Sequence, residues 1–149
     1  MKITYHRQHK LNTCGPACMR MLLEALGIKK SEEELAKVLK TNIKYGTLQK
    51  NLKKEAWLYD LDCDSFSDAK ISDLKKLQKE GYIVIVEFHP PEDFYHYAVI
   101  KSIDKKYVHL FDPWYGPATN LKIQDFVKEW VSNPVVEHNK KRWFIGMKK

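Results

Sequence analysis

The spacing of apolar residues changes near the middle of the chain, and this change constrains the fold more than any other feature. Up to Gly81, apolar side chains recur at helical spacing, as at Cys18, Met21 and Leu22, which predicts amphipathic helices. After Gly81 they gather into short runs rich in β-branched and aromatic residues, beginning with residues 82–88, which predicts strands. Helices followed by strands indicate an α+β fold, with N-terminal helices packed on a C-terminal antiparallel sheet.

Capping residues refine the boundaries of these elements. Ser31 and Glu34 form a capping-box signature at a helix start, and Gly27 and Gly81 are typical helix stops. We expect helices at residues 14–26, at 31–39, from 47 onward, at 73–80 and at 123–131. We expect strands at residues 82–88, 96–103, 107–111 and 142–147.

Size and composition fit one globular domain, residues 1–149. A chain of this length can bury about two thirds of its unfolded surface. The hydrophobic content of 44%, with 12% aromatic residues, is typical of a folded chain. Three cysteines, an odd number, predict no disulfide framework. The sequence shows neither an apolar leader nor an apolar run of ~20 residues, so we expect a cytoplasmic protein without a transmembrane segment.

The overall charge is basic, and lysine pairs occur along the whole chain. Twenty-six Lys and Arg against 19 Asp and Glu give a formal net charge of +7. No basic stripe alternates with aromatic residues, so we expect no nucleic acid partner and interpret the lysines as a solvated surface. A modest attraction to acidic peptides or anionic membranes stays open, as does the oligomeric state.

Cys14 stands where a helix is expected to begin, followed by Gly15 and Pro16. The partial positive charge of a helix N-terminus favours a thiolate, and proline suits the first turn. Gly15 leaves room for a substrate beside the sulfur. Gln8 lies six residues upstream, where its side-chain amide can join the Cys14 N–H in binding an oxyanion. Cys14 is a candidate nucleophile, although a free cysteine at a helix start is more often a buried apolar residue.

A candidate base and its partner lie far downstream. His96 begins one expected strand, and Asp112 follows the next one. With the hairpin turn near Lys105, both residues are about equally far from the turn, so we expect them to face each other across the ladder. Asp112 would then accept a hydrogen bond from the imidazole and fix its orientation. The competing interpretations are a strand histidine bonded to backbone and an Asp-Pro turn.

Cys18 lies one helical turn after Cys14, and His6 and His9 precede both residues. A zinc site made of these four side chains is conceivable but not expected, because no second pair of them has a standard metal-ligand spacing. We therefore expect no metal and no cofactor, and we interpret Cys18 as structural.

Four motifs together resemble a known family. They are Gln8, Cys14-Gly15-Pro16-Ala17, His96-Tyr97-Ala98-Val99 and Asp112-Pro113. Their order and spacing are similar to those of the papain-like clan, and within it to the bacteriocin-processing peptidases that cut peptide leaders after a double glycine. The likeness runs from about Tyr5 to the final apolar run. Two departures are Asn12-Thr13, where members often carry an acidic residue, and the lack of the membrane transporter to which the best-known members are fused.

The resemblance implies a papain-like fold and a cysteine peptidase with a peptide or protein substrate. Cys14 would attack the carbonyl, His96 would move the proton, Asp112 would orient His96, and Gln8 would help to bind the oxyanion. Cleavage after a small-residue pair such as Gly-Gly is implied by the resemblance alone. Two alternatives stay open: an acyl transferase that uses the same acyl-enzyme, and a catalytically silent peptide-binding domain. Whether a separate transporter is a partner also stays open.

Overall fold

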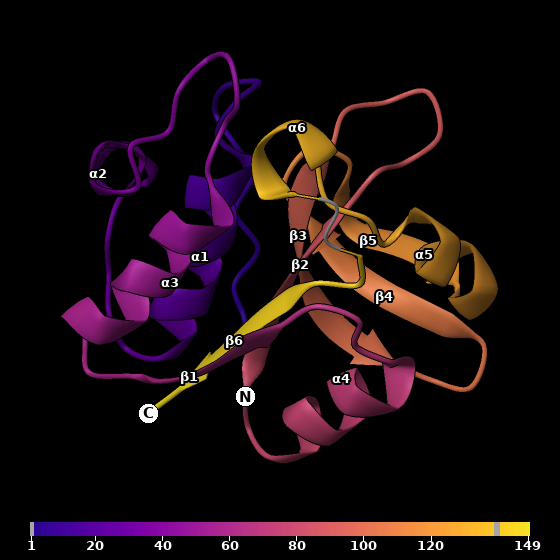
Figure 1. Ribbon diagram of the computed structural model, residues 1–149. Helices are drawn as coiled ribbons and strands as arrows, with labels where there is room; N and C mark the ends of the chain where they lie inside the picture. Colours follow the sequence, from indigo (N-terminus) through magenta and orange to yellow (C-terminus); the bar gives the residue numbers. More distant parts are fainter. Residues whose placement is uncertain (1, 139–140) are drawn as a thin grey trace.

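The computed structural model describes residues 2–138 and 141–149 (Figure 1). Six antiparallel strands form one sheet in the order β1-β6-β2-β3-β4-β5. The strands are β1 Asp62–Phe66, β2 Ile83–Phe88, β3 His96–Ile103, β4 Tyr107–Asp112, β5 Gly116–Lys122 and β6 Phe144–Lys148. The helices are α1 Cys14–Ala25, α2 Glu32–Val38, α3 Gln49–Leu58, α4 Ile71–Lys79, α5 Ile123–Glu129 and α6 Pro134–Glu137.

The central strands are buried on both faces, and each face has its own core. In Figure 1, α1, α2 and α3 lie on one side of the sheet, whereas α4 and α5 lie on the other. Side chains of α1 pack with Val99 of β3 and Ile145 of β6, while Leu74 of α4 and Phe126 of α5 pack with Val86 of β2. Alternation along each strand sends successive side chains to opposite cores, so the apolar run of β2 is buried throughout.

The α+β prediction is confirmed, and most expected elements form. Ser31 and Glu34 make the predicted capping box at the start of α2. The fourth helix begins at Ile71, two residues earlier than expected, because the Asp73 carboxylate accepts a hydrogen bond from the Lys70 N–H at the helix N-terminus. Three elements were not predicted: the edge strands β1 and β5 and the short helix α6.

The β3–β4 hairpin corrects the predicted pairing of His96 with Asp112. A bulge lies between Ile100 and Ser102, and beyond it Val99 pairs with Phe111. Continued by one step, this register places Asp112 opposite the residue two positions after His96. The two side chains still share a face of the sheet, but they meet diagonally rather than directly.

Among the described residues, no helix is both long enough and apolar enough to cross a bilayer.

Candidate active site

Cys14 and His96 line the same cavity, although 82 positions separate them in the chain. The cavity has a volume of about 940 Å³ and lies where the N-terminus of α1 meets the start of β3. Gln8, Trp114 and Tyr115 also line it. A pocket of this size suits a peptide segment. The fold therefore brings three of the four predicted site residues to one opening, and Asp112 lies directly behind His96.

The glycine after Cys14 allows close packing against the segment before α3. A Cβ on Gly15 would lie 2.4 Å from Oγ1 of Thr47, so only glycine fits without displacing that side chain. Thr47 is itself fixed, because its carbonyl accepts a hydrogen bond of 2.7 Å from the Tyr97 hydroxyl. The space that Gly15 leaves is thus occupied by Thr47 rather than kept open for a substrate.

The surroundings of the Cys14 thiol favour its neutral form in this structure. Burial raises the pKa of Cys14 to about 12, and the negative charges of Glu87 and Asp112 add to the rise. Backbone N–H groups of Tyr97 and Gly15 act in the opposite direction but do not outweigh burial. This result differs from the thiolate expected at a helix N-terminus, because loss of water disfavours the charged sulfur more than the helix end favours it.

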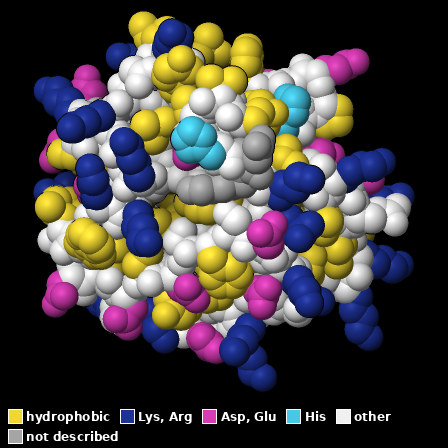
Figure 2. Space-filling view, viewed as in Figure 1, with side chains coloured by type: hydrophobic (Ala, Val, Ile, Leu, Met, Phe, Trp, Pro, Cys, Tyr) yellow, Lys and Arg dark blue, Asp and Glu magenta, His cyan; other side chains and the backbone are white. Residues whose placement is uncertain are grey.

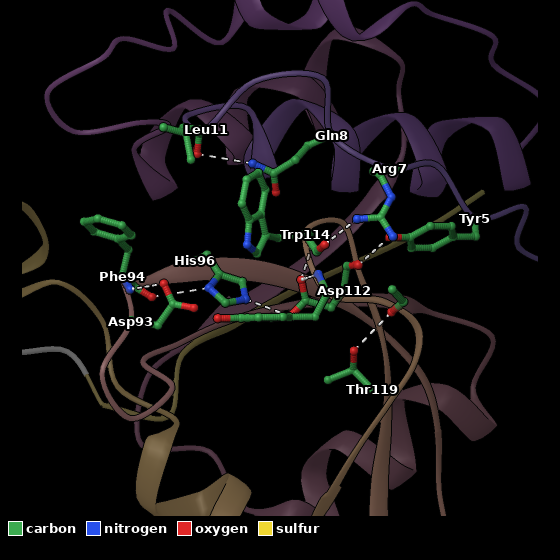
Figure 3. Close-up of polar contacts among 12 residues, drawn as sticks. Tyr5, Arg7, Gln8, Leu11, Asp93, Phe94, His96, Asp112, Trp114 and Thr119 are labelled. Atoms are coloured by element: carbon green, nitrogen blue, oxygen red, sulfur yellow. Dashed lines mark hydrogen bonds and ion pairs between the residues drawn. The ribbon is translucent and has the colours of Figure 1, made fainter.

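The predicted hydrogen bond between His96 and Asp112 forms, although the two residues are not direct cross-strand partners. Its Nε2 lies 2.7 Å from Oδ2 of Asp112, a carboxylate that is fully buried (Figure 3). Its Nδ1 lies 3.3 Å from the carbonyl oxygen of Phe94. Burial lowers the pKa of His96, but the hydrogen bond and charge of Asp112 outweigh that effect, so the pKa is raised overall. The surroundings of the ring therefore favour the imidazolium form.

Cys14 and His96 line one cavity without a hydrogen bond between them among the described residues. The Phe94 carbonyl occupies the Nδ1 side of the ring. Contacts between a nucleophile and its base are often long in an unliganded enzyme and tighten when the substrate binds.

Asp112 is fixed by backbone groups of the connection that follows β4. Its Oδ1 accepts hydrogen bonds from the N–H of Trp114 at 2.8 Å and of Tyr115 at 3.0 Å. This is the Asp-Pro turn named as the competing interpretation, and the same carboxylate also bonds His96. One side chain therefore shapes the turn with one oxygen and holds the imidazole with the other.

Gln8 lines the cavity, but its amide already has partners. The Nε2 group donates to the carbonyl oxygens of Lys10 at 2.7 Å and Leu11 at 3.2 Å. Its Oε1 is buried without a hydrogen-bond partner among the described residues. Donation to an oxyanion would require the longer bond, to Leu11, to break.

The segment that carries Gln8 is bonded to the β4–β5 connection. The Tyr5 hydroxyl donates to the Asp112 carbonyl at 2.6 Å, and Arg7 donates to the Trp114 carbonyl at 2.6 Å (Figure 3). The Gln8 N–H donates to the Pro113 carbonyl at 2.9 Å. The N-terminal segment thereby ties the cysteine side of the cavity to the aspartate side.

The side chains considered as zinc ligands have other partners in the structure. His6 pairs with Glu24 at 2.5 Å, and His9 lies 3.5 Å from the buried carboxylate of Glu32. Cys18 is fully buried in the core beneath α1. Across residues 2–138 and 141–149, no group of three His, Cys, Asp or Glu side chains is placed to hold a metal ion.

Several acidic residues in the cavity wall were not predicted, and among them Glu87 lies within a central strand. Glu87 lies in the apolar run of β2, is 5% exposed and pairs in register with Tyr97. Its carboxylate accepts a hydrogen bond of 2.7 Å from Gln49, whose amide also donates to Ser132 at 2.8 Å. The sequence feature that could have identified Glu87 is its position as the one charged residue within Ile83–Phe88, a run otherwise free of polar residues.

Comparisons with known proteins agree with this geometry. Residues 2–142 match the model of the Peptidase C39 family. A protein of Methanothermobacter thermautotrophicus is 32% identical over 129 residues, which are 87% of this chain and 84% of the relative. The lactococcin-A transport/processing ATP-binding protein LcnC of Lactococcus lactis is 29% identical over 133 residues, 87% of this chain. This chain spans only 18% of the length of LcnC.

Solved structures show the same fold. The peptidase domain of Streptococcus ComA, a bi-functional ABC transporter, superposes with a TM-score of 0.78 at 20% identity and covers 98% of both chains. A double glycine motif protease from an AMS/PCAT transporter, solved with its leader peptide, gives 0.75 at 20% identity, over 99% of this chain and 93% of that one. The predicted papain-like α+β fold is confirmed. The chain belongs to the Peptidase C39 family and is a cysteine-type peptidase.

Proposed function

We propose that Cys14, His96, Asp112 and Gln8 are the catalytic residues of this peptidase. The observation that carries the proposal is the bond of 2.7 Å between His96 and the buried Asp112, on the wall of the cavity that Cys14 also lines. A nucleophile, a base and a group that orients the base are the three parts that acyl transfer requires.

The reaction starts with transfer of the thiol proton to the imidazole. In its neutral form, His96 accepts the Cys14 proton on Nδ1 while Nε2 remains hydrogen-bonded to Asp112. The thiolate attacks the peptide carbonyl, forming a C–S bond and an oxyanion. The C–N bond then breaks, and the imidazolium gives its proton to the leaving amine. Water, deprotonated by His96, hydrolyses the thioester and restores the thiol.

Binding of a substrate peptide would bring the catalytic groups into their working contacts. His96 has to exchange the Phe94 carbonyl for the thiol, and Gln8 has to exchange the Leu11 carbonyl for the oxyanion. Both carbonyls belong to segments that line the cavity, so a peptide that enters between them can displace them together. Binding energy would then be used to assemble the catalytic groups.

For specificity, we infer cleavage after a small-residue pair of the Gly-Gly kind. The double glycine motif protease with its leader peptide supports this assignment by likeness of fold.

The test is cleavage of a peptide that contains one Gly-Gly site, followed by mass spectrometry. Cys14→Ser should abolish cleavage, and His96→Ala should lower kcat by roughly 10²–10⁴-fold. The control Cys63→Ser changes a half-buried cysteine on β1, away from the cavity, and should leave the rate unchanged. Cleavage that survives Cys14→Ser would refute the assignment of the nucleophile.

Two outcomes of the same assay would identify the alternatives. An acyl transferase would join the acyl group to an added primary amine in preference to water, so the product would gain the mass of the amine. A silent domain would bind the peptide without cleaving it, and Cys14→Ser would then bind it as tightly as the parent chain.

A further inference from the structure

The positive charge of this chain is concentrated on one surface. Residues 35–54 contain six lysines and no Asp or Glu, whereas the whole chain has a formal net charge of +7. This segment therefore accounts for six of the seven net charges, a concentration that differs from the even spread expected from the sequence. We define the lysine face as these six exposed residues: Lys37, Lys40, Lys44, Lys50, Lys53 and Lys54.

The lysine face is formed by the end of α2, the loop before α3 and the outer side of α3. Figure 2 shows Lys and Arg side chains over α2 and α3, with hydrophobic side chains beside them and along the upper edge of the molecule. Within the described part of the chain, none of the six lysines forms an ion pair. Their charges are thus available to an anionic partner.

Apolar side chains project from the same surface. Ile43, in the loop between α2 and α3, is 93% exposed, and Val38 at the end of α2 is 53% exposed. On α3, Trp57 is 77% exposed and lies one turn after Lys53. Single exposed apolar side chains are common, but several of them gathered on one charged surface are typical of a protein or membrane interaction site.

We propose that the lysine face binds the surface of an anionic lipid bilayer. Lysines near such a surface are attracted by acidic headgroups, and projecting aliphatic and indole groups enter the interface without needing a complementary pocket. An acidic peptide or a nucleic acid would neutralise the lysines but would leave Ile43 and Trp57 in water. The apolar side chains are what favour lipid.

Exposed acidic residues limit this surface at both ends, with Glu33 and Glu34 in the first turn of α2 at one end. Asp60 and Asp62 are exposed directly after α3, so the docked orientation would place the loop at Ile43 and the first turns of α3 toward the lipid. Ile43, Lys44 and Tyr45 also line the cavity that contains Cys14. The bilayer would therefore lie beside the mouth of the cavity, although the proposal does not depend on the chemistry at Cys14.

The experiment is co-sedimentation of the full chain with vesicles of phosphatidylcholine alone or mixed with phosphatidylserine. We expect binding only to the mixed vesicles, weakening as salt is added. The variant Lys50→Gln/Lys53→Gln/Lys54→Gln should lower partitioning on the order of a hundredfold, at about fivefold per lysine. Ile43→Ser should weaken binding further at every salt concentration.

The matched control removes the same charge from the opposite face of the sheet. Lys75, Lys76 and Lys79 are exposed on α4, and their triple change to Gln should leave vesicle binding nearly unchanged. Equal loss with both triple variants would mean that only net charge matters and would overturn the proposal. Equal binding to neutral vesicles, no binding to either kind, or binding of RNA or an acidic peptide in place of vesicles would also overturn it. Peptide cleavage by each variant in free solution reports separately on the catalytic site.

Discussion

Replacing Glu87 with Gln should stabilise the protein in alkaline solution. Burial raises the pKa of Glu87 from 4.5 to about 7, and neighbouring Glu137 adds to the rise against hydrogen bonds from Gln49 and Asn133. Because the folded-state pKa is the higher one, the stabilising contribution of the protonated form is complete below 4.5 and is lost as the pH rises through about 7. The full span corresponds to roughly 3 kcal/mol, an upper value that local relaxation reduces.

The assay is urea unfolding of the parent chain and of Glu87→Gln, followed by circular dichroism across the pH range. At about pH 4, below both pKa values, the two free energies of unfolding should be similar, because a protonated carboxyl and an amide are both neutral. At about pH 8.5 the variant should be more stable by up to roughly 3 kcal/mol, since only the parent chain must then bury a charge.

A matched change at an exposed glutamate provides the control. Glu33 lies on the outer side of α2, and Glu33→Gln should shift stability by less than about 0.5 kcal/mol at either pH. A Glu87→Gln effect that is equal at both pH values would refute the reasoning, because it would show that Glu87 does not change its ionisation in the folded state within this range. The same variant should also raise the alkylation rate of Cys14 in alkaline solution, since the charge of Glu87 contributes to the raised pKa of that thiol.

Four further changes test the site and the fold. Asp112→Asn should lower kcat and move the acid limb of the kcat/KM profile to lower pH, because Asp112 raises the pKa of His96; an unmoved limb in initial-rate assays would contradict this. Gln8→Ala should lower kcat by roughly 10²–10³-fold if the amide turns toward the oxyanion, and an unchanged kcat would show that it stays on the Lys10 and Leu11 carbonyls. Gly15→Ala should cost about 1–3 kcal/mol by crowding Thr47, measured as a lower Tm, and Gly15→Ala/Thr47→Gly should recover most of the loss. Ser31→Ala should cost about 1 kcal/mol in urea unfolding by removing the α2 cap, with an unchanged slope against denaturant.

The sequence predicted the elements whose side chains alternate or repeat strongly, and it failed where they do not. Strand β1, Asp62–Phe66, lies at the edge of the sheet and carries two aspartates and a serine. Its sequence therefore shows no regular apolar pattern that would predict a strand. Strand β5, Gly116–Lys122, is the opposite edge and contains a proline, which is tolerated only where no ladder bond is needed. Edge strands are specified by what they pair with, which a local pattern does not contain.

The candidate site shows the same division between local and long-range information. The spacing of His96 and Asp112 around the hairpin turn predicted their contact. It could not predict the bulge after Ile100, which makes that contact diagonal. The helix start at Cys14 was read correctly, whereas the raised pKa of its thiol depends on burial by residues far away in the chain. The partners of the Gln8 amide are its own near neighbours, yet their choice depends on the loop conformation rather than on residue type.

The bond between Tyr5 and the Asp112 carbonyl spans 107 positions, and this separation sets the order in which the molecule can become active. Cys14, the proposed nucleophile, emerges early in synthesis, but its cavity has no second wall until β3, β4 and the following turn have been made. Long-range contacts form late, because the loop that they close costs the most chain entropy. A growing chain that ends before residue 112 therefore carries Cys14 without the hydrogen-bonded pair of His96 and Asp112.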